Sequence, residues 1–254
     1  MKKKKIILII GGHDPTSGAG ITADIETAGY FNYHPLSILT CSTIQNTSKV
    51  IKVNKMPNNY IYSSFKELIK EFKIDVIKIG LIPSIRSSKE ILKILENKKI
   101  KNIPIIIDPI INSGSGRKLV FKNNINFVVK NLYPKALLLT PNKCEYNIIK
   151  KIHKQHSTEN IKNILITDYK FKKNHIALKL IESEASNEKE FNIKKFSKIY
   201  HGTGCTFSTA IACNISDNNS IEKSIAIALN YMKKVIEVSS IEGKKQFLLN
   251  RSLY

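Results

Sequence analysis

The stretch HGTGCTFSTAIA, from His201 to Ala212, places glycines and a cysteine directly before small and apolar residues that predict a buried helix. A glycine-rich turn before a helix presents backbone N–H groups and the positive end of the helix dipole, which together hold a phosphoryl group. Gly202 and Gly204 would form that anion site. Cys205 would stand at the helix start, where the pKa of a thiol falls, so it could take a proton from a substrate hydroxyl. Alternatively, Cys205 packs beneath the turn as a small buried residue, the role expected of Cys213.

Polar side chains also follow other apolar runs of the chain. Asp108 begins the loop DPIINSGSG, where its carboxylate would suit a metal-bound water or a lysine at a phosphate; alternatively, it forms a turn before Pro109. Gln45 lies in the expected loop STIQNT. Its amide could offer both a donor and an acceptor to a flat heterocycle, or it could bond its own backbone.

A further glycine-rich loop, GGHDPTSGAGITAD, begins at Gly11. Its glycines permit close backbone approach and positive φ. The spacing fits neither the G-x-G-x-x-G dinucleotide fingerprint nor the G-K-[ST] end of a Walker A loop. Asp24, the last residue of the stretch, falls inside the helix expected to follow.

The loops described above connect predicted strands and helices that alternate regularly along the chain. Short β-branched runs predict strands at 6–10, 36–41, 76–80, 104–108, 136–140 and 164–167, and helical patterns occupy 18–30, 60–72, 87–96, 204–213 and 221–238. Such alternation is typical of a largely parallel sheet covered by helices on both faces. Ligands of open α/β sheets bind beyond the carboxyl ends of the strands, so the loops after strands are where chemistry is expected.

Length and composition predict one domain over residues 1–243, followed by a C-terminal tail of uncertain order at 244–254, because 254 residues with 42% hydrophobic content can bury one sizeable core. The formal charge of +21 comes mainly from scattered lysines. Arg86, Arg117 and Arg251 are the only arginines, so the bidentate guanidinium typical of nucleic-acid recognition is nearly absent. The sequence therefore predicts no nucleic-acid partner, although anionic small molecules would still be attracted.

The cysteines and the N-terminal residues indicate in which cellular compartment the protein is expected. The four cysteines show neither zinc-ligand spacing nor a disulfide framework, which predicts a reduced, cytoplasmic protein. The start MKKKKIILII resembles a signal peptide, but its apolar run is short and is better interpreted as a first strand. No stretch approaches the roughly 18 apolar residues of a membrane span, so no membrane partner is expected.

Taken in order, the motifs resemble those of one enzyme family. IIGGHDPTSGAGITAD is followed by QNT, KIG, DP, SG, TPNKCE and HGTGC. This combination resembles the hydroxymethylpyrimidine and phosphomethylpyrimidine kinases of thiamine biosynthesis, within the ribokinase-like superfamily, and extends from about Ile7 to Val238. The resemblance implies a ribokinase-like α/β fold, a three-layer α/β/α sandwich with a mostly parallel central sheet.

The resemblance also implies an ATP-dependent kinase that uses Mg²⁺. It would phosphorylate the hydroxymethyl group of 4-amino-5-hydroxymethyl-2-methylpyrimidine and then convert the monophosphate to the diphosphate. Phosphoryl transfer needs mainly positioning, a metal and charge stabilisation, with a modest base for the hydroxyl. Related enzymes are commonly dimers, so a homodimer is expected, with the pyrimidine and ATP as the other partners.

Matching positions of this sequence take their roles from the family. The residues expected to line the pyrimidine pocket are Gly12, Asp24, Gln45, Leu81 and Ile110. The expected anion hole consists of Gly202, Gly204 and Cys205, where Cys205 occupies the place of an aspartate base in other ribokinase-like enzymes. The residues expected on the nucleotide side are Asp108, Asn142, Glu145, Thr167 and Thr203, with Asp108 and Glu145 also at the magnesium ion.

The chain departs from the family pattern on the nucleotide side. The family carries K-G-G-H after a strand where this sequence reads ILITDYK, so residues 167–169 replace a flexible glycine pair. The family lysine before SG is Gly114 here, and the segment between Glu145 and Ile164 is shorter by most of one helix. These departures cluster on the ATP half.

Two alternatives therefore stay open. A pyridoxine or pyridoxal kinase would share the scaffold, although Gln45 with Asp24 fits an aminopyrimidine better than a pyridine phenol. A non-catalytic descendant would bind the pyrimidine without consuming ATP.

Overall fold

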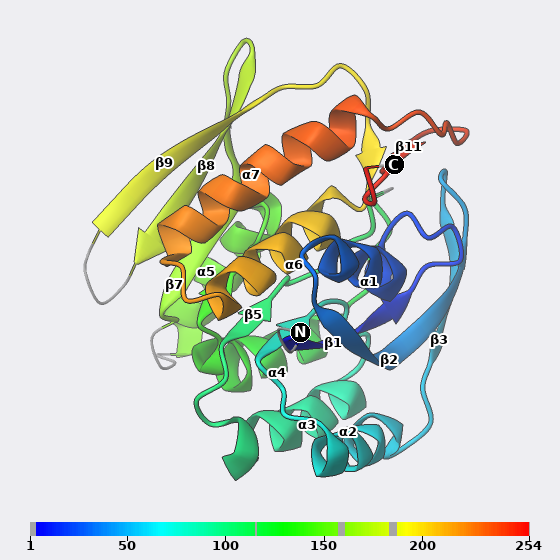
Figure 1. Cartoon of the computed structure of the whole chain (residues 1–254). Coiled ribbons are helices and arrows are strands. Elements are labelled where there is room, and N and C mark those ends of the chain that lie inside the picture. Colours follow the sequence, from blue (N-terminus) through cyan, green and yellow to red (C-terminus); the bar gives the residue numbers. More distant parts are fainter. Residues whose placement is uncertain (1–3, 115, 157–160, 183–186, 254) are drawn as a thin grey trace.

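The computed structural model describes residues 4–114, 116–156, 161–182 and 187–253, so Ser115 of the SG motif lies outside the described residues. One nine-stranded sheet forms its centre, in the order β3-β2-β1-β4-β5-β6-β7-β8-β9 (Figure 1). The strands are β1 (Ile6–His13), β2 (His34–Gln45), β3 (Val50–Lys55), β4 (Val76–Ile79), β5 (Ile105–Ile107), β6 (Leu138–Leu139), β7 (Asn163–Phe171), β8 (His175–Glu182) and β9 (Asn187–Lys194). A separate pair consists of β10 (Tyr200–His201) and β11 (Phe247–Leu248).

Helices fill the connections between the strands. The α-helices are α1 (Gly20–Tyr30), α2 (Tyr60–Glu71), α3 (Ile85–Leu95), α4 (Lys122–Asn131), α5 (Lys143–His156), α6 (Thr203–Ser216) and α7 (Ile221–Glu237). Short 3₁₀ helices lie at Lys98–Ile100 and Tyr133–Lys135. Strands β2, β1, β4, β5, β6 and β7 run parallel, while β3, β8 and β9 pair antiparallel at the two edges. The prediction of a mostly parallel sheet is confirmed.

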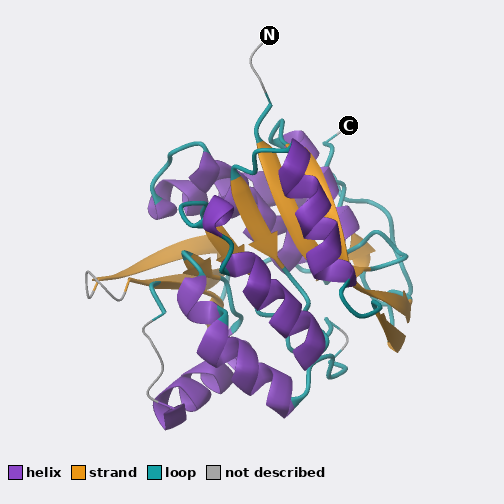
Figure 2. Ribbon diagram, turned by 90° about the horizontal axis from the view of Figure 1, so that it is seen from below, coloured by secondary structure: helices purple, strands orange, loops and turns teal. Residues whose placement is uncertain are grey.

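Two apolar layers separate the sheet from its helices, because successive side chains of a strand point to opposite faces. In β1, Leu8 and Ile10 belong to the core shared with α2, α3, α4 and α5. Ile7 and Ile9 belong to the other core, shared with α1, α6 and α7. Figure 2 shows helices on both sides of the strands. The predicted three-layer α/β/α sandwich is confirmed.

Several elements differ from the sequence-based expectation. Strand β2 continues through Gln45, so this residue ends a strand rather than lying in a loop. Helix α5 occupies 143–156, in the segment that looked short by most of a helix. The charged segment after Lys170 forms β8 and β9. Lysine, asparagine and glutamate predominate in β9, so its own residues gave little signal, whereas β8 contains apolar residues that the sequence analysis did not assign to a strand.

The segment from Lys244 to Leu253, interpreted above as a tail, packs against the body of the protein. Phe247 and Leu248 pair in parallel with Tyr200 and His201. Further along, Leu249 lies in the core beneath α6 and α7. Two strands distant in sequence thus meet directly before the glycine turn that precedes α6.

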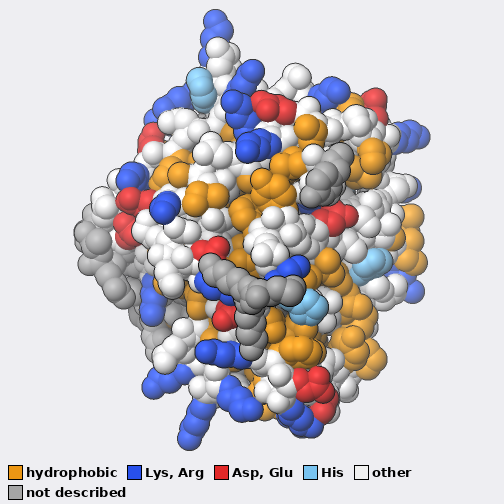
Figure 3. Space-filling view, in the orientation of Figure 1, with side chains coloured by type: hydrophobic (Ala, Val, Ile, Leu, Met, Phe, Trp, Pro, Cys, Tyr) orange, Lys and Arg blue, Asp and Glu red, His pale blue; other side chains and the backbone are white. Residues whose placement is uncertain are grey.

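Basic side chains are dispersed over the surface. On the face in Figure 3, lysine and arginine side chains are scattered from the edge to the centre, with acidic side chains among them. Within the part of the chain that the structure describes, every helix is too short or too polar to cross a bilayer.

Candidate active site

One cavity of about 550 Å³ lies beyond the carboxyl ends of the parallel strands. The structure brings every site residue predicted from the sequence to its walls: Gly12, Asp24, Gln45, Leu81, Asp108, Ile110, Asn142, Glu145, Thr167, Gly202, Thr203, Gly204 and Cys205. They come from segments spread over most of the chain, and parallel strands carry them to one edge because their carboxyl ends coincide.

The glycine turn before α6 has the geometry of an anion site. Gly202 caps the helix with φ of 75°, a left-handed conformation that favours glycine. A Cβ on Gly202 would lie 1.9 Å from the carbonyl oxygen of Gly18, so the two loops approach each other closely. The first turn of α6 leaves the N–H groups of Thr203, Gly204 and Cys205 without carbonyl partners inside the helix. These donors can hold phosphoryl oxygens.

The loop after β1 is organised around the buried carboxylate of Asp14. It accepts hydrogen bonds from the N–H groups of Thr16 and Ala19, at 2.9 and 3.1 Å, and its Oδ2 lies 2.6 Å from Nε2 of His201. Burial raises the pKa of Asp14, but the hydrogen bonds from His201 and Thr16 outweigh it and hold the pKa below its ordinary value. Asp14 therefore ties this loop to the residue that precedes the glycine turn.

Cys205 lies where predicted, but its titration is opposite to the prediction. Burial raises the pKa of the thiol to about 12, assisted by Asp24 and Asp108 and opposed by Lys78 and the N–H of Gly20. A helix start lowers the pKa of a thiol that keeps contact with water, whereas this side chain is desolvated. The expectation of a lowered pKa was wrong, and the thiol carries its proton at neutral pH.

A buried ion pair beneath Cys205 was missed by the sequence analysis. Lys78 in β4 is fully buried, and its Nζ lies 2.9 and 2.8 Å from the two carboxylate oxygens of Asp24. Thr209 donates a further hydrogen bond to Asp24 at 2.8 Å. Burial lowers the pKa of Lys78, but Asp24 holds it above its ordinary value, so the ammonium is charged. A lysine inside the apolar run VIKIG was the signal that could have found this pair.

Asp108 completes the buried charge cluster. The Cys205 thiol lowers the pKa of its carboxylate, and a Cβ added to Gly204 would lie 3.7 Å from its Oδ2, an ordinary van der Waals distance. Burial raises the pKa of Asp108 to about 6, with Lys78 lowering and Asp24 raising it. The carboxylate is therefore mostly ionised at neutral pH but close to its protonation range.

We expect Asp108→Asn to stabilise the fold at pH 8. The pKa of Asp108 rises from an ordinary 3.8 to about 6 on folding, so its protonated form adds stability that is complete below about pH 4 and lost as the pH rises through 6. Asparagine resembles the protonated form at every pH. Urea unfolding should show a gain on the order of 1–3 kcal/mol at pH 8, absent near pH 4. A variant less stable than wild type at pH 8 would contradict this cause.

The N-x-x-E motif forms a capping box at the start of α5. Glu145 accepts a hydrogen bond from the Asn142 N–H at 3.0 Å, and Asn142 Oδ1 accepts one from the Glu145 N–H at 2.9 Å. Burial, followed by repulsion from Asp108, raises the pKa of Glu145 to about 8. The motif thus has a structural role beside the one the resemblance implies.

A magnesium ion is compatible with this part of the cavity. Among the described residues there is no group of three or more metal-ligating side chains that could hold an ion. Mg²⁺ commonly uses one or two carboxylates, with substrate phosphates and water completing its shell. Glu145 supplies a carboxyl group, whose raised pKa a bound cation would lower, and Thr140, also on the cavity wall, has a buried hydroxyl with no hydrogen-bond partner among the described residues. That hydroxyl fits a metal-bound water.

The ILITDYK segment forms an irregular stretch of β7 beside the cavity. The pairing with β8 shifts between Ile166 and Lys170. Thr167 donates its N–H to the Pro141 carbonyl at 2.9 Å, and Asp168 accepts the N–H of Lys143 at the start of α5. Residues 167–169 therefore continue the strand and brace α5, where the family has a glycine pair.

The far end of the cavity is apolar. Its walls there include side chains from β8, β9 and α7: Leu178, Ile193, Leu229, Met232 and Ile236. A flat aromatic base suits such a surface, because apolar walls supply most of the binding area in small-molecule sites.

Comparison with known proteins identifies the family of this chain. The profile of the phosphomethylpyrimidine kinase family matches residues 14–250, nearly the whole chain. The chain belongs to this family. The resemblance inferred from the motifs is thus confirmed.

Two relatives illustrate the match. The chain is 29% identical over 251 residues to a hydroxymethylpyrimidine/phosphomethylpyrimidine kinase of Aquifex aeolicus, covering 94% of this chain and 97% of the relative. It is 33% identical over 244 residues to a bifunctional thiamine biosynthesis protein of Methanocaldococcus jannaschii, covering 94% of this chain but 54% of the relative. The chain thus spans about half the length of several curated relatives it matches.

Solved structures confirm the ribokinase-like fold. An ADP complex of Bacillus subtilis pyridoxal kinase superposes with a TM-score of 0.83 at 22% identity, covering 99% of this chain and 98% of that one. A phosphomethylpyrimidine kinase from Clostridium difficile superposes with a TM-score of 0.72 at 23% identity, covering 92% and 100%.

Proposed function

We propose that this member of the phosphomethylpyrimidine kinase family is an ATP-dependent kinase of thiamine biosynthesis. It transfers phosphate to 4-amino-5-hydroxymethyl-2-methylpyrimidine and then to the monophosphate, forming the diphosphate. The observation that carries the proposal is the single cavity that joins a polar heterocycle pocket, an anion site at α6 and an apolar base pocket. Family membership and the names of the relatives support the same function.

The pyrimidine occupies the end of the cavity near β1 and β2. Gln45 offers its amide to the aminopyrimidine edge, and Leu81 and Ile110 provide apolar contacts for the ring. Gly12 allows the ring to approach the backbone. Asp24 forms the floor of this pocket, and because its carboxylate already bonds Lys78 and Thr209, it acts through charge and position more than through direct recognition.

The anion site receives the transferred phosphoryl group. Backbone N–H groups at the start of α6 stabilise the charge of the transition state, which is the main demand of phosphoryl transfer. The hydroxyl oxygen of the substrate attacks the γ-phosphorus of ATP, and the bond between this phosphorus and the oxygen that leaves with ADP breaks. The proton of the substrate hydroxyl passes to the Cys205 sulfur, while the thiol proton passes to the Asp108 carboxylate. Because the thiol is protonated in the free protein, this relay needs the Asp108 carboxylate.

ATP lies with its base in the apolar end and its phosphates toward Thr167, Thr203 and Asn142. Mg²⁺, when bound, neutralises phosphate charge. Glu145, with Thr140 through water, would hold the ion. The electrostatic interaction of Asp108 with the Cys205 thiol favours proton acceptance for Asp108 over the magnesium role that the resemblance implies.

Phosphorus NMR tests this function. The purified protein is incubated with Mg²⁺, ATP and the hydroxymethylpyrimidine, with pyridoxal in parallel. Monophosphate followed by diphosphate is expected. No product from either ring, with pyrimidine binding intact by calorimetry, would favour the non-catalytic descendant. A homodimer and a cytoplasmic location stay predictions, and analytical ultracentrifugation tests the first.

A pyridoxal kinase is the second candidate, because the solved pyridoxal kinases share this fold. We expect Gln45→Leu to separate the two, since it removes the amide that pairs with the aminopyrimidine edge. The KM for the pyrimidine should rise about tenfold or more, because an unpaired polar group in a binding site is costly. The KM for ATP should stay unchanged, and steady-state kinetics measures both. An unchanged KM for the pyrimidine together with faster turnover of pyridoxal would favour the second candidate.

A further inference from the structure

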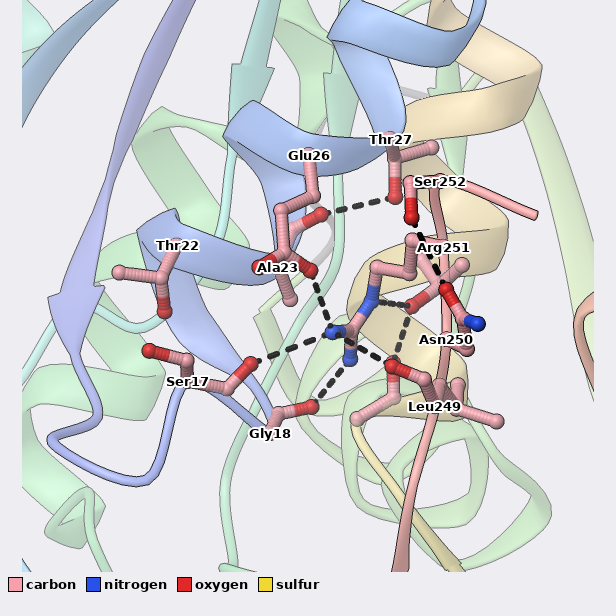
Figure 4. A network of polar contacts seen from close by, with 12 residues as sticks. Ser17, Gly18, Thr22, Ala23, Glu26, Thr27, Leu249, Asn250, Arg251 and Ser252 are labelled. Atoms are coloured by element: carbon pink, nitrogen blue, oxygen red, sulfur yellow. Dashed lines mark hydrogen bonds and ion pairs between the residues drawn. The ribbon is translucent and has the colours of Figure 1, made fainter. Parts of the chain in front are cut away.

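Arg251, in the segment first interpreted as a tail, has one of the largest fully buried side chains in the described chain. Figure 4 shows its guanidinium pointing toward the carbonyls of Ser17 and Gly18 and toward Glu26 of α1. Nη1 lies 3.2 Å from the Ser17 carbonyl and 3.0 Å from Glu26 Oε2, and Nη2 donates to the Gly18 carbonyl. Nε donates to Thr206 Oγ1 in α6 at 2.8 Å.

These contacts join the two loops that form the anion site. Gly18 belongs to the loop after β1, and its carbonyl is the group that Gly202 approaches most closely. Thr206, which accepts from Arg251, in turn donates to the Gly202 carbonyl at 2.8 Å. The guanidinium of Arg251 is therefore hydrogen-bonded both to the loop after β1 and to the first turn of α6, at the point where these two segments come closest. His201 and Asp14 tie the same two segments together from the cavity side.

Burying the charged guanidinium of Arg251 costs free energy, so stability alone does not explain why an arginine lies at this position. Arg251 is 2% exposed, while the side chain of its ionic partner Glu26 is 46% exposed. Taking a guanidinium out of water costs several kcal/mol, and buried ion pairs are often replaceable by apolar side chains without loss of stability. What an apolar residue cannot do is bridge two backbone carbonyls and a hydroxyl in a fixed plane. Arginine has the forked donors for this geometry.

We propose that Arg251 is a positioning residue for phosphoryl transfer, which fixes the loop after β1 relative to the anion-binding turn of α6. The inference rests on the proposed function. Arg251 does not touch the cavity, so it acts through Gly18 and Thr206. A displacement of about 1 Å between reacting groups can cost about 10²-fold in rate.

Kinetics of Arg251→Gln and Arg251→Lys test the proposal, with Tyr231→Phe as the matched control. Tyr231 donates to the Arg251 backbone carbonyl at 2.9 Å, so the control loosens the same segment without touching either loop. We expect kcat per folded molecule to fall about 10²-fold in Arg251→Gln and less in Arg251→Lys, which keeps one donor group. The KM for ATP should stay within about twofold, and Tyr231→Phe should lower Tm while keeping kcat.

Hydrogen exchange read by mass spectrometry supplies an answer independent of activity. Peptides covering residues 14–20 and 200–206 should exchange faster in Arg251→Gln, while Tyr231→Phe should affect mainly 244–253. If Arg251→Gln does not fold, Arg251→Lys carries both measurements. Folded Arg251 variants with wild-type kcat, or with unchanged exchange in the two loops, would overturn the proposal. A wild-type protein that phosphorylates neither ring would instead reject the proposed function, and exchange would still decide whether Arg251 holds the loops.

Discussion

Cys205→Ser is expected to lower kcat by about 10²-fold or more, within the usual range for acid–base catalysis. The thiol and the Asp108 carboxylate interact electrostatically inside a desolvated cluster, so the thiol can pass its proton to that carboxylate while it accepts the proton of the substrate hydroxyl. A serine hydroxyl has nearly the same size, but it gives up its proton much less readily. Pyrimidine binding, measured by calorimetry, should change little because the ring contacts remain.

Cys213 provides the matched control for this prediction. It lies on the same helix α6 and is fully buried, as the sequence predicted, but it packs in the apolar core away from the cavity. Cys213→Ala and Cys205→Ala remove the same sulfur from two positions. We expect the first to lower Tm with kcat retained, and the second to abolish most turnover. Unchanged turnover in Cys205→Ser would return Cys205 to the structural role that the sequence left open.

Lys78→Met is expected to destabilise the protein by about 3–5 kcal/mol. The substitution leaves the Asp24 carboxylate buried without its cation, and this uncompensated charge is what makes breaking a buried pair costly. Such a loss is a large part of the roughly 5–15 kcal/mol that keeps a typical domain folded. The pKa of Asp108 and of Cys205 should also rise further, because Lys78 lowers both. Urea unfolding measures the stability.

The double variant Lys78→Met with Asp24→Asn separates charge from packing. If the cost comes from the unpaired carboxylate, the double variant should be more stable than Lys78→Met alone, because both charges have been removed. Equal instability of the single and double variants would show that the lysine side chain matters through its packing. Activity should stay low in both, since the cluster beneath Cys205 is altered.

The sequence by itself determined the layers of the fold and the edge of the sheet at which the candidate site lies. The β-branched runs and helical patterns are local features, and they are sufficient to predict a parallel sheet with chemistry beyond its strand ends. The sequence also supplies, at Gly202, the residue type that adopts a left-handed conformation without steric cost. The strands β8 and β9 were not predicted; β9 has few apolar residues, and its neighbour in the sheet stabilises it more than its own residues do.

Only the tertiary structure decided the electrostatics of the site. The pKa of Cys205 depends on burial and on charges brought from α1, β4 and the end of β5, none of which is near it in sequence, so a helix-start argument gave the wrong direction. The same holds for Lys78, whose partner Asp24 is supplied by another element. Arg251 was placed in a tail of uncertain order, and its proposed role follows from contacts with residues more than two hundred positions earlier. Local patterns specify elements, whereas burial and charge pairing arise when distant segments meet.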